Sequence, residues 1–121
     1  MSMQWKSAVA VAAVAFFAGC GEPVTEGETA YKTYCLSCHG TKGVGGIGPN
    51  VTFSATAGIA SWSGAQVLTL VRTGTDKEGM QTCKTMTRFS ATQLSDAKVA
   101  LIYDYLKTLK NDTVNKGSSC P

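Results

Sequence analysis

The last third of the chain carries the clearest pattern of apolar and polar positions. Its apolar residues recur at intervals of three and four, which places them in one stripe along a helix; they are Val99, Ile102, Leu106 and Leu109. We expect this helix to begin near Ser95, whose hydroxyl suits the N-cap position, and to end near Leu109. Lysines near its end, where the helix dipole is negative, agree with this boundary.

A second helix is predicted in the middle of the chain. Ser63 is a suitable N-cap, and Gly74 stands where a glycine commonly ends a helix. Between them lies a short apolar face, made of Val67, Leu68 and Val71. Trp62, just before this helix, is expected to contribute aromatic area to a core.

A first, shorter helix is predicted from Glu28 to about Tyr34. Gly27, Tyr31 and Cys35 are spaced four residues apart, so they lie on one face of this helix. Before it, residues 20–26 are polar and form a tether, with Pro23 and Gly27 as breakers of regular structure. The three helices together predict an all-α fold.

The strongest chemical signal is the segment Cys35-Leu36-Ser37-Cys38-His39-Gly40. Two thiols three positions apart, followed at once by a histidine, have the spacing at which two haem vinyl groups are captured as thioethers while the imidazole binds the iron. A bare C-x-x-C would also suit a redox dithiol or a zinc site. The adjoining histidine, which is the only one in the chain, favours the haem.

The N-terminal residues resemble an export signal. Lys6 precedes an apolar run from Ala8 to Ala18 that is too short to span a bilayer. Residues 17–20, Phe-Ala-Gly-Cys, resemble a bacterial lipobox, so we expect residues 1–19 to be removed and Cys20 to be acylated. Cleavage after Gly21, which would release a soluble protein, is the alternative. Either reading predicts an extracytoplasmic, periplasmic protein, membrane-anchored if Cys20 carries lipid.

Composition limits the remaining possibilities. The chain has 121 residues and a formal charge of +3, which suits one small domain. Its lysines are scattered and form no basic run, so a nucleic-acid partner is not expected. No cluster of catalytic acids, bases or nucleophiles is evident, which predicts a protein that is not itself an enzyme.

Two further cysteines are left once the motif and Cys20 are assigned. These are Cys83 and Cys120, and in an oxidising compartment two spare cysteines usually form a disulfide. The bridge would close a loop of about 37 residues and stabilise the fold by roughly 3 to 4 kcal/mol in the chain-entropy model. Cys83 as an iron ligand is the competing interpretation.

Taken with the haem motif, residues 27–109 resemble the class I cytochrome c family. That family has a small residue and an aromatic residue before C-x-x-C-H-G, as Gly27 and Tyr31 stand here, and packs this helix against its C-terminal one. The resemblance places Ile102 and Tyr105 at the crossing, where Gly27 would permit close approach.

The resemblance also assigns residues around the cofactor. Gly48-Pro49-Asn50 resembles a segment whose proline carbonyl accepts a hydrogen bond from the iron-bound histidine, so Pro49 would orient His39. Trp62 would donate its indole N–H to a haem propionate, as a tryptophan near this point does in several members. Both residues have simpler interpretations, as a turn and as core aromatic area.

Two methionines are candidates for the sixth iron ligand. Met86 precedes Phe89 by three residues, which is the family's layout, although Thr87 replaces the usual proline. Met80 is the runner-up and has only a preceding glycine in its favour. Either could instead fill a gap in the core or lie exposed on a loop.

The resemblance implies an all-α cytochrome c fold, with three main helices around one covalently attached haem c. It implies a monomeric single-electron carrier with His39 and Met86 as axial ligands, a domain over residues 27–110 and a tail over residues 111–121. Redox partner proteins would dock near Lys42 and Lys84. The alternatives are a five-coordinate haem protein that binds a gas or turns over peroxide, and an electron-transfer subunit of a larger dehydrogenase or oxidase complex.

Overall fold

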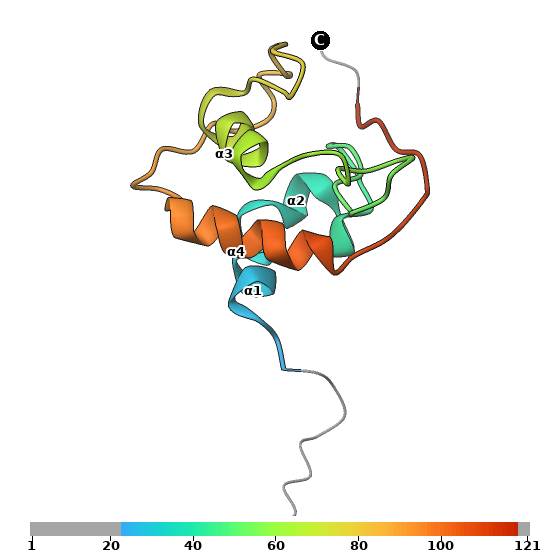
Figure 1. Ribbon diagram of the computed structural model, residues 1–121, viewed down its shortest axis with the longest axis horizontal. Helices are drawn as coiled ribbons and strands as arrows, with labels where there is room; N and C mark the ends of the chain where they lie inside the picture. Colours follow the sequence, from blue (N-terminus) through green and yellow to red (C-terminus); the bar gives the residue numbers. More distant parts are fainter. Residues whose placement is uncertain (1–22, 119–121) are drawn as a thin grey trace, which may run out of the picture.

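The computed structural model describes residues 23–118, which form a helical fold (Figure 1). Its helices are α1 (Glu26–Tyr34), α2 (Leu36–His39), α3 (Gly64–Thr73) and α4 (Asp96–Lys107), with a short 3-10 turn, η1, at Thr41–Gly43. In this part of the chain no strand forms, and an isolated bridge joins Thr75 to Gln81. The predicted all-α class is confirmed.

Helix α1 begins two residues earlier than predicted because Thr25 caps it. The hydroxyl of Thr25 accepts a hydrogen bond from the backbone N–H of Glu28 at 3.1 Å. Gly27 therefore lies inside the helix and is buried, so its prediction as a breaker was wrong. The helix ends at Tyr34, as expected.

Helices α1 and α4 cross at close range. A Cβ atom on Gly27 would overlap the backbone carbonyl of Leu101 and lie 3.1 Å from Cβ of Tyr105. The rings of Tyr31 and Tyr105 meet beside this point, with their centroids 5.5 Å apart. The crossing that the resemblance implied near Gly27 and Tyr31 is confirmed, and the absence of a side chain on Gly27 permits it.

Helix α3 has both of the predicted ends. Ser63 and Gln66 form a reciprocal capping box at its start, and Gly74 closes it in the left-handed conformation, with φ of 73°. Helix α4 is capped by Ser95 and ends at Lys107, two residues before the predicted Leu109.

The core lies between α1, α3 and α4. Its buried apolar residues are Ala30, Tyr31, Val67, Leu94, Val99, Ile102 and Leu106. Three of the four residues of the predicted stripe on α4 are in this set, and Leu109 packs against it while partly exposed. The helical periodicity therefore identified the buried face correctly.

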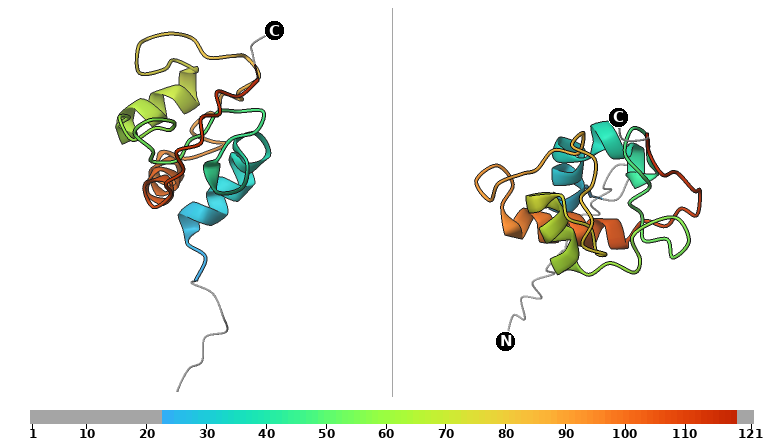
Figure 2. Two further views of the ribbon diagram at one scale, coloured as in Figure 1. Left: turned by 90° about the vertical axis from the view of Figure 1, so that its right-hand side faces the viewer. Right: turned by 90° about the horizontal axis from the view of Figure 1, so that it is seen from above.

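After α4 the chain turns back across the molecule. Residues 111–118, called the C-terminal tail below, run beside the loop that follows α2 (Figure 2). The backbone N–H of Asn50 donates to the carbonyl of Asn115 at 2.9 Å, and that of Ser118 donates to the carbonyl of Ile47 at 2.8 Å. The side chain of Asn50 adds two more hydrogen bonds, to the carbonyls of Asn111 and Thr113.

Candidate cofactor site

A large cavity of about 700 Å³ lies between α1, α2, α3, α4 and the loop before α4. Its wall is mostly apolar and includes core residues from three helices, among them Val67, Ile102 and Leu106. The predicted ligating residues of α2 and the loop methionine Met86 line the same cavity. Its volume and apolar lining are those of a site for a sizeable, flat, apolar cofactor.

Both motif thiols and the histidine are presented to the cavity by one helical turn. The backbone N–H of His39 donates to the carbonyl of Cys35 at 2.9 Å, and the N–H of Cys35 continues α1 by donating to Tyr31 at 2.8 Å. Cys35 and Cys38 are free thiols. Because the turn is continuous with α1, the packing of α1 on α4 sets where these three side chains point.

The environment of Cys35 does not suit a redox dithiol. Burial raises the pKa of its thiol to about 12, and the nearby Cys38 contributes in the same direction. Reactive pairs of this spacing work with a lowered pKa, because the thiolate is the nucleophile. The burial of Cys35 therefore argues against a redox dithiol at this site.

His39 is buried, and its ring is held in one orientation. Its Nδ1 lies 2.8 Å from the carbonyl oxygen of Pro49, so Nδ1 carries the proton and donates it. This is the contact that the resemblance assigned to Pro49. Burial lowers the pKa of His39, which keeps the ring neutral and leaves Nε2 able to bind a metal.

Gly48 is packed directly against the imidazole. A Cβ atom at this position would lie 2.7 Å from Cε1 and 2.8 Å from Nδ1 of His39, well inside ordinary contact. The sequence predicted a role for Pro49 but gave no reason for a glycine at position 48. The Gly-Pro pair itself was the only sign of the contact between Gly48 and the imidazole.

The two candidate methionines occupy different environments. Met86 is half-buried and lines the cavity that contains His39. Met80 is 65% exposed, at the tip of the loop, and is not part of the cavity wall. The arrangement brings Met86, and not Met80, to the cavity that also contains the motif.

Other residues predicted to contact the cofactor fall around the same cavity. Trp62 lies half-buried in its wall, and its backbone carbonyl accepts a hydrogen bond from the hydroxyl of Tyr103 at 2.8 Å. Cys83 also lines the cavity and is not among the free cysteines of residues 23–118. Cys20 and Cys120 lie outside the described residues, so the lipid anchor and the pairing of Cys83 with Cys120 stay predictions.

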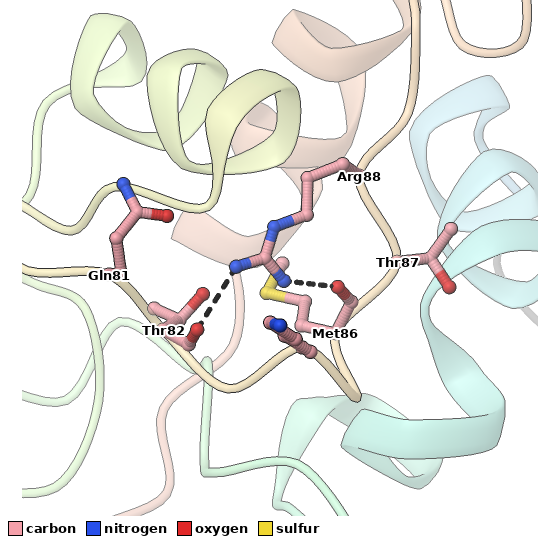
Figure 3. Close-up of a pocket in the computed structure, with 6 residues that line it drawn as sticks. Gln81, Thr82, Met86, Thr87 and Arg88 are labelled. Carbon is pink, nitrogen blue, oxygen red and sulfur yellow. Dashed lines mark hydrogen bonds between the residues drawn. The ribbon is translucent and has the colours of Figure 1, made fainter.

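Sequence reasoning missed two contributors to the site. The C-terminal tail brings Lys116 and Ser118 to the edge of the cavity. Arg88 turns inward and donates hydrogen bonds to backbone carbonyls of the loop that carries Met86 (Figure 3). Neither has a sequence signal, because backbone carbonyls occur at every position and the path of the tail depends on the fold.

The residues present fit a haem c. The chain offers two free thiols, a neutral oriented imidazole and a thioether around one apolar cavity, and these are the donors that c-type haem attachment and iron ligation use. Within residues 23–118, none of the helices combines the length and hydropathy that a bilayer crossing requires.

Comparison with known proteins agrees with this chemistry. Residues 22–106, well over half of the chain, match the family model described as cytochrome C oxidase, cbb3-type, subunit III. The search of curated proteins found no match. The family's members are class I c-type cytochromes, typically extracytoplasmic, that transfer electrons to and from redox partners by means of haem. The chain belongs to this cytochrome c family.

Proposed function

We propose that the protein is a single-electron carrier with one covalently bound haem, attached at Cys35 and Cys38 and ligated by His39 and Met86. The observation that carries the proposal is that all four side chains line one apolar cavity. When bound, the haem iron supplies a one-electron couple between its ferric and ferrous states.

The chain's own residues have separate tasks in this proposal. Cys35 and Cys38 would hold the porphyrin through two thioether bonds, each formed by addition of the S–H across a vinyl double bond, which needs no external oxidant. Pro49 keeps the proton of His39 on Nδ1, which directs the lone pair of Nε2 toward the iron. The soft sulfur of Met86 favours the ferrous state, and the apolar wall disfavours the extra charge of the ferric state, so both raise the potential.

The axial ligation separates this function from gas binding or peroxide turnover. If His39 and Met86 both held the iron, they would leave no position open to a substrate. A ferric low-spin spectrum with the weak far-red charge-transfer band of sulfur ligation is expected for the purified protein. A high-spin spectrum, or immediate binding of carbon monoxide to the reduced protein, would contradict it.

Matched methionine variants test the identity of the ligand. Met86→Ala should remove the far-red band and open the iron to carbon monoxide, whereas Met80→Ala, at an exposed position, should leave both unchanged. The reverse result would make Met80 the ligand. Loss of the band in neither variant would exclude methionine ligation by these two residues.

The compartment and partners remain proposals for the whole chain. Cys20 would carry a lipid that holds the domain at a periplasmic membrane surface, and a disulfide between Cys83 and Cys120 would fasten the tail. Intact mass of the mature protein reports haem, lipid and disulfide together. The family description names an oxidase subunit, so an oxidase is the partner to test first. Stable co-purification with the oxidase would indicate that this protein is a subunit. Transient binding that weakens when Lys42 or Lys84 is replaced would indicate a mobile carrier.

A further inference from the structure

We infer that Arg88 is the residue that positions the sixth iron ligand. Residues 82–88 are called the ligand loop below. The guanidinium of Arg88 donates hydrogen bonds to three backbone carbonyls of this loop and so holds Met86 at the cavity wall. The inference rests on the proposed ligation by His39 and Met86. It assigns to Arg88 a role in ligand exchange that goes beyond stabilising the fold.

The hydrogen bonds converge on one planar group. Nη1 of Arg88 donates to the carbonyl of Cys83 at 2.8 Å and to that of Met86 at 2.5 Å, and Nη2 donates to the carbonyl of Thr82 at 3.0 Å. Figure 3 shows the guanidinium inside the curve of the loop, between Thr82 and Met86. Since the carbonyl of Met86 is bonded directly, this contact holds the backbone from which the Met86 side chain extends.

Arg88 is the main partner of two of these carbonyls. Among the described residues, the carbonyls of Thr82 and Met86 accept no other hydrogen bond, whereas Cys83 has further contacts, including the N–H of Met86 on its carbonyl. No described carboxylate lies within ion-pair distance of Arg88. The carbonyls of the loop therefore stabilise the positive charge of the guanidinium. Such charge-assisted hydrogen bonds are stronger than those between neutral groups.

The same guanidinium ties the loop to helix α3. It lies so close to Gly74, the C-cap residue that follows that helix, that a Cβ atom there would overlap it. The N–H and hydroxyl of Thr82 both donate to the carbonyl of Gly74, at 2.7 and 2.9 Å, and the N–H of Phe89 donates to the carbonyl of Val71 at 2.9 Å. A positive group at the C-terminal end of α3 is also favoured by the helix dipole.

The loop is consequently held by polar contacts to a rigid helix more than by apolar packing. Met86 is only half-buried and Lys84 and Thr85 are exposed, so few apolar contacts hold residues 84–86 at the cavity. Removing the guanidinium should let the loop move away from the cavity. An external ligand would then compete with the sulfur more successfully, since its apparent affinity rises with the fraction of molecules in which the sulfur has left.

The test is imidazole binding to the ferric holoprotein of Arg88→Gln and Arg88→Lys. Loss of charge-assisted hydrogen bonds should raise the affinity for imidazole by roughly 10- to 100-fold in Arg88→Gln and weaken the far-red band, with a smaller change in Arg88→Lys. The matched control is Lys98→Gln, which removes one positive charge from the exposed face of α4. Lys98 is exposed, and its side chain forms no hydrogen bond or ion pair among the described residues, so the imidazole affinity of this variant should stay within about twofold of wild type.

Each outcome decides the point. If Arg88→Gln melts at a lower temperature but binds imidazole with wild-type affinity, Arg88 has only a structural role. That result would overturn the inference and leave the proposed function intact. A wild-type protein without the far-red band would refute methionine ligation itself, and this inference with it. If Arg88→Gln does not fold, imidazole binding to Arg88→Lys takes its place. Hydrogen exchange of the Arg88 side-chain N–H groups in the wild-type protein is then measured as well. Slow exchange is expected, and fast exchange would overturn the inference.

Discussion

The contact between Gly48 and the imidazole of His39 gives the sharpest prediction for the site. In Gly48→Ala the new Cβ would stand 2.7 Å from Cε1 of His39. Ordinary contact begins near 3.4 Å, so the ring or the loop must move by about 0.7 Å. The ring cannot move freely, because Nδ1 is bonded to Pro49 and the opposite nitrogen is the proposed iron ligand.

The expected cost combines two effects. Overpacking a well-filled site costs about 1 to 3 kcal/mol, and weakening the hydrogen bond from His39 to Pro49 adds about 0.5 to 1.5 kcal/mol. Together they should lower the free energy of unfolding by about 2 to 4 kcal/mol. For a domain of this size that corresponds to a fall of at least about 10 °C in melting temperature.

The assay is denaturant unfolding of the ferric holoprotein, followed by far-ultraviolet circular dichroism and by the visible spectrum. Gly46→Ala is the matched control, since it makes the same change two residues away, where the nearest atom to the new Cβ is the carbonyl oxygen of Cys38 at 3.2 Å. We expect Gly48→Ala to be clearly less stable than the control and to gain a high-spin component. Equal stability and unchanged spectra in the two variants would refute the steric argument.

Three further predictions concern the scaffold. Gly27→Ala should lower the free energy of unfolding by about 1 to 3 kcal/mol despite its higher helix propensity, because the new methyl group would overlap the carbonyl of Leu101; a gain of stability in denaturant titrations would contradict this. Asn50→Ala should cost about 2 to 4 kcal/mol and speed proteolysis of the C-terminal tail, since the buried amide makes four hydrogen bonds. Reduction of the proposed Cys83–Cys120 bridge should lower the melting temperature without changing the visible spectrum, and an unchanged melt would count against the bridge.

The family and the fold class could be read from the sequence because their signals are local. The spacing from Cys35 to His39 places three donors on one helical turn whatever the rest of the chain does. Helix caps are similarly local, which is why Ser63 and Ser95 marked two helix starts correctly. Gly27 shows the limit: the family resemblance placed it correctly at the helix crossing, yet its residue type alone was misread as a breaker.

The sequence by itself determined the family, through the spacing of the haem motif, and the buried face of the last helix, through its apolar periodicity. Only the tertiary structure decided that Gly48 abuts the imidazole, that Arg88 holds the carbonyls around Met86, and that the C-terminal tail returns to the loop at Asn50. Each of these contacts involves a backbone group: Cα of Gly48, the carbonyls that Arg88 bonds, or the N–H and carbonyl groups of the tail. Backbone carbonyls and N–H groups are the same at every residue, so residue types carry no record of which of them meet.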